Sequence, residues 1–229
     1  MRAAMPRPVI ATRIRKSTQL LGLAAALFLV LFASDVHAQP TERDDEGDYQ
    51  PEYERRSDFF AGATLGIGVM SARGYPNEAG QLNNPDFVAD PGIGPGSHYA
   101  VWLGVAFRDW LSFGMGLNGL GYSAKDLEAS GGGFIVRVEA FPMFYAFEEG
   151  RDIGLYGVFG LGTMKIKDGD TDRADGGALS IVGFGAFYEP LRFGNFSAGP
   201  TVEYTRFFSQ SLELQSASAG FRLAFYGGP

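Results

Sequence analysis

The chain has 229 residues, of which 45% are hydrophobic, 33 are Gly and 20 are Phe, and it contains no Cys. The lack of Cys excludes disulfides, thiolate metal sites and a Cys nucleophile, and the wealth of Gly and Phe favours packed β structure over disorder. The first 38 residues contribute +4 to the net charge of −7, which leaves −11 on the remainder. Nucleic acid, which is bound through clustered Lys and Arg, is therefore not an expected partner.

Residues 1–38 have the pattern of a secretory signal peptide. A basic start is followed by an uncharged apolar run of 14 residues, Leu20 to Ala33, and then by the small-residue site Val36-His37-Ala38. A membrane-spanning helix needs about 20 apolar residues, so this run is too short for an anchor. We predict export, with cleavage between Ala38 and Gln39.

Residues 39–57 are predicted to form an acidic, disordered leader in the periplasm. They hold seven acids and three arginines and show no apolar period. A segment of this composition cannot bury enough apolar surface to offset the entropy lost on folding.

From Asp58 onward the hydrophobic period is two, which predicts β-strands in a domain of residues 58–229. In the first strand Leu65, Ile67 and Val69 share one face, whereas Thr64, Gly66 and Gly68 share the other. Eight strands are expected, at about 59–71, 99–107, 111–122, 132–145, 152–166, 177–188, 195–208 and 215–226. The faces of the segments 152–166 and 177–188 both mix Gly with large apolar residues, so their register stays open.

The connections between these strands alternate in length over most of the chain. Residues 72–96 are rich in Pro, Gly and Asn and show no strand period, whereas only Arg108-Asp109-Trp110 joins the next two strands. Long surface loops and short periplasmic turns alternate in this way in outer-membrane barrels. We expect loop 72–96 to face outside and to contact any extracellular ligand. The aromatics at the strand ends are expected to form two girdles, which include Phe59, Phe107, Trp110, Phe144, Tyr145, Phe187, Tyr188, Phe196, Phe225 and Tyr226 at one rim and Tyr99, Tyr122, Phe134, Phe207 and Phe208 at the other.

The predicted fold is an all-β, eight-stranded antiparallel up-and-down transmembrane β-barrel. A soluble lipocalin-like carrier is the rival, but it would place charges outside and large apolar residues inside. Here the smaller face is mostly Gly, Ala, Ser and Thr, and few charges lie within the strands. Bulky residues facing lipid fit this pattern better than a solvated exterior.

Residues 58–226 resemble the OmpA/OmpX-type small outer-membrane barrels. The resemblance is carried by the alternation, by the turn Phe107-Arg108-Asp109-Trp110-Leu111, and by the last strand Ala219-Gly220-Phe221-Arg222-Leu223-Ala224-Phe225. It implies a barrel in the cell outer membrane in contact with its lipid. We expect a monomer that needs no cofactor.

Four charged residues are predicted to form an ion network in the lumen. Arg137, Glu139, Glu203 and Arg222 all lie on the face opposite the apolar one. If Phe208 pairs roughly with Gln215, Glu203 falls diagonal to Arg222, which predicts an Arg222–Glu203 pair, with Glu139 as a further partner. Such a network would either plug the lumen or gate a narrow pore.

A fifth charged residue, Arg206, falls on the outward face near the outer rim. It is predicted either to contact a lipid phosphate or to extend its charged end to water.

Metal binding and catalysis receive weaker support. Asp168, Asp170 and Asp172 have the spacing of a calcium loop, but Arg173 stands where that loop needs Gly, so no metal is expected. His98 could pair with Ser97 or Ser123 in a lipid-editing enzyme. The leading hypothesis is a non-catalytic structural or surface-interaction protein. The alternatives are a narrow porin-like pore for ions or small solutes, the lipid-editing enzyme and the soluble carrier.

Overall fold

The structure, a computed structural model, describes residues 56, 58–78, 80–146 and 148–227. The predicted signal peptide lies outside the described residues, as does the acidic leader apart from Arg56. Within the described residues no helix is long and apolar enough to span a membrane.

Eight antiparallel strands form the barrel wall. Each strand pairs with the next, and β10 pairs with β1 from Phe60↔Tyr226 to Gly74↔Leu212, which closes the sheet. The wall strands are β1 (Asp58–Gly74), β2 (Ala89–Arg108), β3 (Leu111–Ala124), β4 (Leu127–Ala140), β5 (Ile153–Asp168), β7 (Leu179–Tyr188), β9 (Phe196–Phe208) and β10 (Leu212–Tyr226). The short strands β6 (Thr171–Asp175) and β8 (Leu191–Phe193) extend it, and two 3₁₀ turns are η1 (Pro85–Phe87) and η2 (Glu148–Asp152). The expected eight-stranded barrel is confirmed.

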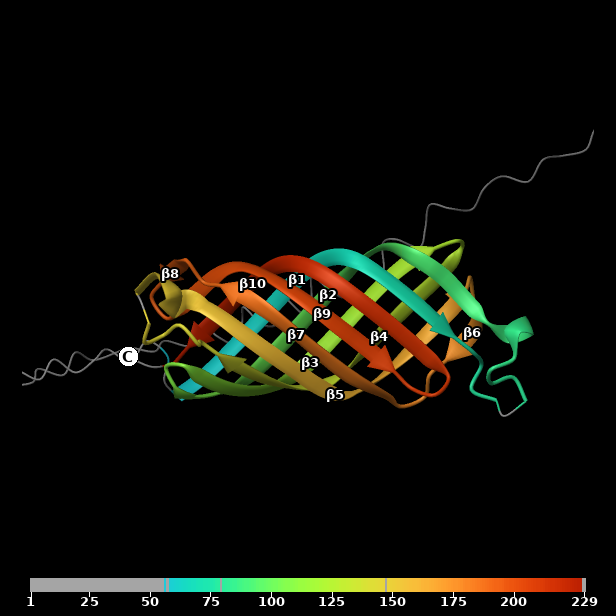
Figure 1. Ribbon diagram of the computed structural model, residues 1–229, viewed down its shortest axis with the longest axis horizontal. Coiled ribbons are helices and arrows are strands. Elements are labelled where there is room, and N and C mark those ends of the chain that lie inside the picture. Colours follow the sequence, from blue (N-terminus) through green and yellow to red (C-terminus); the bar gives the residue numbers. More distant parts are fainter. Residues whose placement is uncertain (1–55, 57, 79, 147, 228–229) are drawn as a thin grey trace, which may run out of the picture. The chain divides into compact units, whose positions relative to one another are not determined.

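The two ends of the barrel differ (Figure 1). The terminal end, at the left of the view, is where β1 begins and β10 ends, and it carries the two-residue turn between β2 and β3 and the short strand β8. The loop end, at the right, carries β6 and the connection from β1 to β2.

Several predicted loops at the loop end are strand, which corrects the sequence-based boundaries. The loop predicted at 72–96 spans only 75–88, because β1 and β2 continue to pair as far as Gly74↔Ala89. Pro91 and Pro95 are tolerated because β3 pairs with β2 only from Gly96 onward. Before Gly96 the β3-facing edge of β2 has no partner strand, so no main-chain donor is needed there.

The loops expected after the third and fifth strands are tight hairpins. Lys125 and Asp126, both with positive φ, form the two-residue turn between β3 and β4. Gly169, also with positive φ, lies in the turn between β5 and β6. Positive φ values at both central positions suit the right-handed twist of hairpin strands. Connection length therefore does not separate the two ends as cleanly as predicted.

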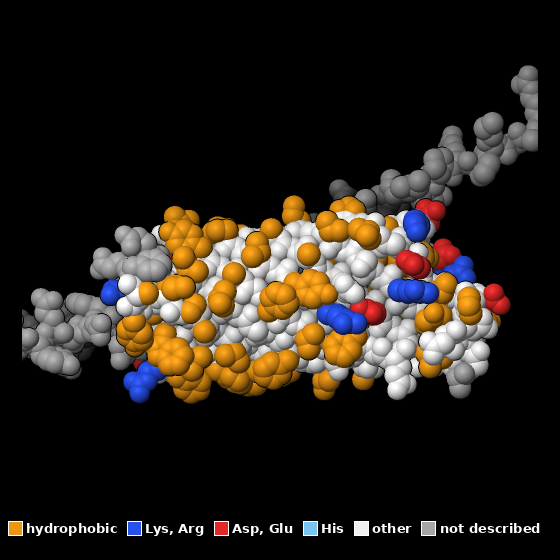
Figure 2. Space-filling view, viewed as in Figure 1, with side chains coloured by type: hydrophobic (Ala, Val, Ile, Leu, Met, Phe, Trp, Pro, Cys, Tyr) orange, Lys and Arg blue, Asp and Glu red, His pale blue; other side chains and the backbone are white. Residues whose placement is uncertain are grey.

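Burial alternates along every wall strand and fixes the register that the sequence left open. In β5 Tyr156 and Val158 are buried and Leu155 is exposed, and in β7 Ile181 and Phe187 are buried. Large apolar side chains cover the outside of the barrel, as the left and middle of Figure 2 show. Their exposed fractions reach 76% for Ile67 and 67% for Leu161. Such a surface suits lipid and argues against a soluble carrier.

Toward the loop end the pattern inverts. On β1 the outward residues change from Ile67 and Val69 to Ser71 and Arg73, whereas the inward residues change from glycines to Met70 and Ala72. On β10 the outward Ala217 gives way to Gln215 and Glu213, and the inward Ser216 gives way to Leu214 and Leu212. Charged side chains accordingly gather at the right of Figure 2.

This inversion marks the edge of the lipid-facing band. Val69 pairs with Ala217 and Ser71 pairs with Gln215, so the change occurs at one level on neighbouring strands. The 11 steps from Asp58 to Val69 of β1 rise by about 26 Å if a strand advances about 3.3 Å per residue at a tilt of about 45°. The apolar band of outer-membrane barrels is about 25 Å tall. The remainder of the barrel has the polar exterior and apolar interior of a water-soluble protein.

Part of the predicted aromatic girdles lies inside the barrel instead. Five of the aromatics assigned to the rims are buried: Phe144, Phe187, Tyr226, Tyr122 and Phe207. The two faces of a strand alternate, so position near a strand end alone cannot tell an inward ring from an outward one.

Candidate functional site

The lumen near the terminal end contains a buried ion network around Arg222. Its Nη1 and Nη2 lie 2.6 and 2.8 Å from the two carboxylate oxygens of Glu139, and its Nε lies 2.8 Å from Glu189 Oε1. All three side chains have no solvent exposure. A bidentate arginine–carboxylate pair is among the strongest polar contacts available to a protein.

Arg137 extends the network along the barrel. Its Nε donates to Glu139 Oε1 at 2.5 Å, and its guanidinium lies between the rings of Trp102 and Tyr156, 4.1 and 3.5 Å from their centroids. The guanidinium of Arg222 also lies over the Trp102 ring, 4.9 Å from its centroid, and over the Phe187 ring, 4.1 Å from its centroid. Arginines and aromatic rings therefore stack alternately inside the barrel. Gly62 makes room for this stack, because a Cβ there would overlap the Trp102 ring.

Arg56 and Glu189 complete this part of the lumen, and both were missed in the sequence. Arg56 Nη2 lies 3.2 Å from Asp152 Oδ1 and 3.6 Å from Glu189 Oε2, and its guanidinium lies 3.6 Å from the Phe141 ring. The main-chain amide of Arg56 donates to Asp109 Oδ1, which fixes it to the β2–β3 turn. Both residues lie outside the periodic strands, and no sequence signal predicts that their side chains turn inward.

Glu203 does not pair with Arg222, contrary to the prediction. Phe208 pairs with Glu213 rather than Gln215, because Ser209 Oγ accepts the amides of Ser211 and Leu212 and closes a tight turn. This shift by two residues puts Glu203 opposite Ser218, four residues from Arg222.

The actual partners of Glu203 lie nearer the loop end. Tyr156 Oη donates to Glu203 Oε2 at 2.6 Å, the hydroxyl of Thr205 donates to its other oxygen, and His98 Nε2 lies 3.3 Å from Oε1. The Asn118 side chain is 3.2 Å from the same His98 nitrogen. Glu203 therefore belongs to a second, separate polar cluster in the middle of the lumen.

The geometry does not support a Ser-His pair. His98 is buried inside the barrel, whereas Ser97 and Ser123 occupy outward positions on β2 and β3. A nucleophile and its base must lie within hydrogen-bond reach of each other, and side chains on opposite faces of the wall do not.

An apolar layer fills the lumen between the middle and the loop end. Its side chains are at most 4% exposed: Met70, Leu120, Tyr122, Met164, Ile166, Leu179, Ile181, Phe207, Leu212 and Leu214. An eight-stranded barrel is just filled by its own side chains, and in this layer those side chains are apolar.

Arg206 projects from the outer surface, as the sequence predicts. Its Nε lies 2.8 Å from Glu213 Oε1, and its side chain is 45% exposed. The guanidinium also lies over the Phe208 ring, 5.4 Å from the centroid.

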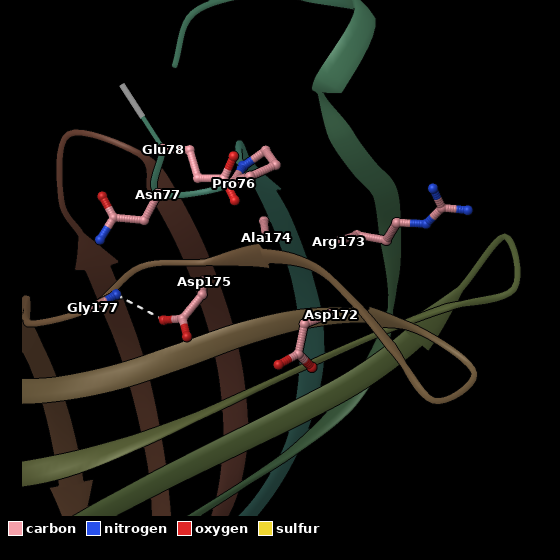
Figure 3. Close-up of a pocket in the computed structure, with 8 residues that line it drawn as sticks. All are labelled: Pro76, Asn77, Glu78, Asp172, Arg173, Ala174, Asp175 and Gly177. Atoms are coloured by element: carbon pink, nitrogen blue, oxygen red, sulfur yellow. Dashed lines mark hydrogen bonds between the residues drawn. The ribbon is translucent and has the colours of Figure 1, made fainter. Parts of the chain in front are cut away.

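A pocket of about 390 Å³ opens at the loop end (Figure 3). It lies between the β1–β2 connection and the β6 hairpin, and its charged lining residues are Glu78, Asp172, Arg173 and Asp175. In Figure 3 the Arg173 side chain extends away from the others. Arg173 in the lining, and Lys165 beside Asp172 and Asp175, offset much of its negative charge.

The aspartates of the β6 hairpin are engaged by basic side chains rather than arranged as a metal site. Asp172 Oδ2 accepts from Lys165 Nζ at 2.9 Å, and Asp168 accepts from Arg173 at 2.6 Å. The Lys165 hydrogen bond lowers the pKa of Asp172 from its ordinary value of 3.8, and the same bond raises the pKa of Lys165. No group of three acidic or His side chains in the described part of the chain could hold a metal ion.

Comparison with known proteins finds similarity in structure but not in sequence. No family model and no curated protein sequence matches the chain. Neisserial surface protein A superposes with a TM-score of 0.46 and 14% identity, over 72% of this chain and 95% of that one. Ail, the attachment invasion locus protein of Yersinia pestis, gives 0.41 and 15%, over 72% and 99%.

The N-terminal β-barrel domain of Pseudomonas aeruginosa OprF gives a TM-score of 0.38 and 11% identity, over 74% of this chain and 99% of that one. The likeness is one of fold alone. The closed eight-stranded barrel and its apolar exterior rest on the strand pairing and burial of this chain itself, and its function has to be argued from its own residues.

Proposed function

We propose that this protein is an integral outer-membrane barrel with a closed lumen and a non-catalytic role. It anchors a polar outer platform in the membrane and presents it to the surroundings. The observation that carries the proposal is the succession of two packed layers in one lumen, the ion network around Arg222 and the apolar layer around Phe207.

Each layer opposes conduction for its own reason. In the ion network the buried charges are already paired with one another: among the described residues they are Arg56, Arg137, Arg222, Glu139 and Glu189. An ion that entered would have to break one of these pairs. In the apolar layer it would lose its hydration shell without gaining polar partners.

Planar-bilayer recording of the refolded protein tests the proposal. We expect no unitary conductance steps for the unmodified protein. Two neighbouring residues provide a matched test of the apolar layer, since Phe207 is buried in the lumen and Phe208 is 36% exposed on the outside. Phe207→Ala should destabilise the barrel by about 3–5 kcal/mol, and Phe208→Ala should cost clearly less. Discrete conductance, or equal costs for the two substitutions, contradicts a packed and closed lumen.

A narrow pore is the second candidate, and one observation favours it. Several buried polar atoms in the middle of the lumen have no protein partner, among them Arg137 Nη1 and Nη2 and Asn118 Oδ1. Buried polar atoms without protein partners are commonly satisfied by water, so a hydrated chamber would lie between the two layers. Conduction would require both layers to open.

The loop end is the proposed contact surface for an extracellular ligand. It carries residues 75–88 and the acidic pocket of Figure 3, on a rigid scaffold of the kind on which binding loops are usually mounted. The proposal places the signal-peptide cleavage after Ala38 and both ends of the mature chain in the periplasm.

A further inference from the structure

A polar cluster interrupts the apolar exterior at the edge of the lipid-facing band. Ser71, Gln215 and Arg206 pair across β1, β10 and β9 in one row, directly above the row of Val69, Ala217 and Tyr204. The next row toward the loop end contains Arg73, Glu213 and Phe208. Two arginines therefore share one outward face with a single carboxylate, at the level where lipid headgroups meet the protein.

We propose that Arg73 and Arg206 form a binding site for the phosphate of an outer-leaflet lipid, with Glu213 between them. The inference rests on the membrane placement proposed above. Arg73 is exposed and stands directly opposite Glu213, where paired side chains have Cβ atoms about 5 Å apart. With Arg206 bound to the same carboxylate, the site keeps a net charge of +1.

Arg206 is positioned for this role and keeps donors available. It contacts Glu213 through Nε, and its side chain is 45% exposed, so that a ligand can approach the two Nη groups. The Phe208 ring supports the guanidinium from one side. A planar guanidinium donates two parallel hydrogen bonds to a phosphate, which an ammonium cannot do.

Neighbouring side chains hold Glu213 in place. Gln215 Nε2 donates to Glu213 Oε1 at 2.5 Å, and Tyr204 Oη donates to Gln215 Oε1 at 3.1 Å. Val182 lies opposite Arg206 in the same row, and Phe184 and Val202 lie nearer the terminal end. These outward residues are 42–65% exposed and offer an apolar surface for acyl chains. The cluster thus combines an anion-binding end with an apolar one, which matches a phosphorylated lipid rather than free phosphate.

Native mass spectrometry of the detergent-solubilised full chain tests this site. The probe is dioleoyl phosphatidic acid, and dioleoylglycerol and inorganic phosphate are the two comparison ligands. We expect one phosphatidic acid molecule to bind in preference to the comparison ligands. The Arg73→Gln/Arg206→Gln variant should bind it about tenfold or more weakly, because the loss of one hydrogen bond to a charged group changes a binding constant by about that factor. Lys167→Gln, which removes an exposed cation from the nearby hairpin, is the matched control and should leave binding unchanged.

Glu213→Gln gives a second, opposite readout. It removes the carboxylate that competes with the phosphate, so binding should tighten, an effect that a merely structural role for Glu213 would not produce. The site is refuted if the double variant binds as the unmodified protein does, or if Lys167→Gln weakens binding equally. Equal retention of dioleoylglycerol, or competition by inorganic phosphate at equal concentration, refutes a lipid phosphate as the occupant. The conductance test of the closed lumen is independent of all these outcomes.

Discussion

Removing Arg222 should destabilise the barrel strongly, and the loss should depend on Glu139. Arg222→Leu deletes three charge-assisted bonds, two to Glu139 and one to Glu189, and leaves both carboxylates fully buried. Breaking a buried ion pair costs about 3–5 kcal/mol. Glu139 keeps its bond from Arg137, and Glu189 keeps one from Tyr226. We therefore expect the lower part of that range, about 3 kcal/mol.

A double-mutant cycle isolates the interaction. Arg222→Leu and Glu139→Leu should couple by at least about 1.5 kcal/mol, because the double variant removes both buried charges together. Arg222→Leu and Glu203→Leu are the matched control and should add to within about 0.5 kcal/mol, since the four residues from Ser218 to Arg222 span about 13 Å of strand.

Unfolding in denaturant, followed by the mobility of unboiled samples on gels, provides the assay. Gel mobility is preferable to fluorescence alone, because Trp102 contacts Arg222 and would report the substitution directly. Coupling below about 0.5 kcal/mol between residues 222 and 139, or clear coupling between 222 and 203, would refute this ion network.

Three further predictions concern export, topology and the β6 hairpin. N-terminal sequencing of the membrane-extracted protein should find Gln39 first, and a start before Leu31 would contradict the signal peptide. External protease on intact cells should cut within residues 75–88 and spare the turn at Asp109 and Trp110, and the reverse pattern would invert the topology. The Asp172 carboxyl should titrate below its ordinary 3.8 and return toward it in Lys165→Gln. Because the folded pKa is lowered, this pair should stabilise the hairpin at neutral pH and cease to do so as acid protonates Asp172. Carboxyl-carbon NMR shifts of Asp172 provide the measurement, and an identical titration in both proteins would exclude the pair.

The sequence predicts the wall of the barrel well because one physical signal repeats in every strand. Alternation identifies inward and outward faces independently of the partner strand, and it places Arg137, Glu139, Glu203 and Arg222 inside. The pairing of Arg222 could not be predicted in the same way. It depends on the register of β9 against β10, which the turn at Ser209 determines.

The residues that the sequence missed share a different cause. Arg56 and Glu189 reach the lumen from connecting segments, where no period indicates direction. The loops at the loop end were overestimated for a related reason. There the outward side chains become polar and the inward ones apolar, so a strand such as β5 beyond Thr163 no longer has the lipid-facing pattern. A search tuned to bulky outward residues therefore ends β1, β3 and β5 two or three residues too early and begins β2, β4 and β10 three to ten residues too late.

The inversion of that pattern also determines how the protein responds to the thickness of its bilayer. If the barrel moved outward, Val69 and the apolar residues at the same level would be exposed to water. If it moved inward, Arg206 and Glu213 would enter the hydrocarbon of the membrane. Both displacements are unfavourable, so the barrel has one preferred depth. In a thicker or thinner membrane the lipids around it would have to compress or stretch. The barrel would then distribute itself toward regions of matching thickness without any specific recognition of a sorting partner.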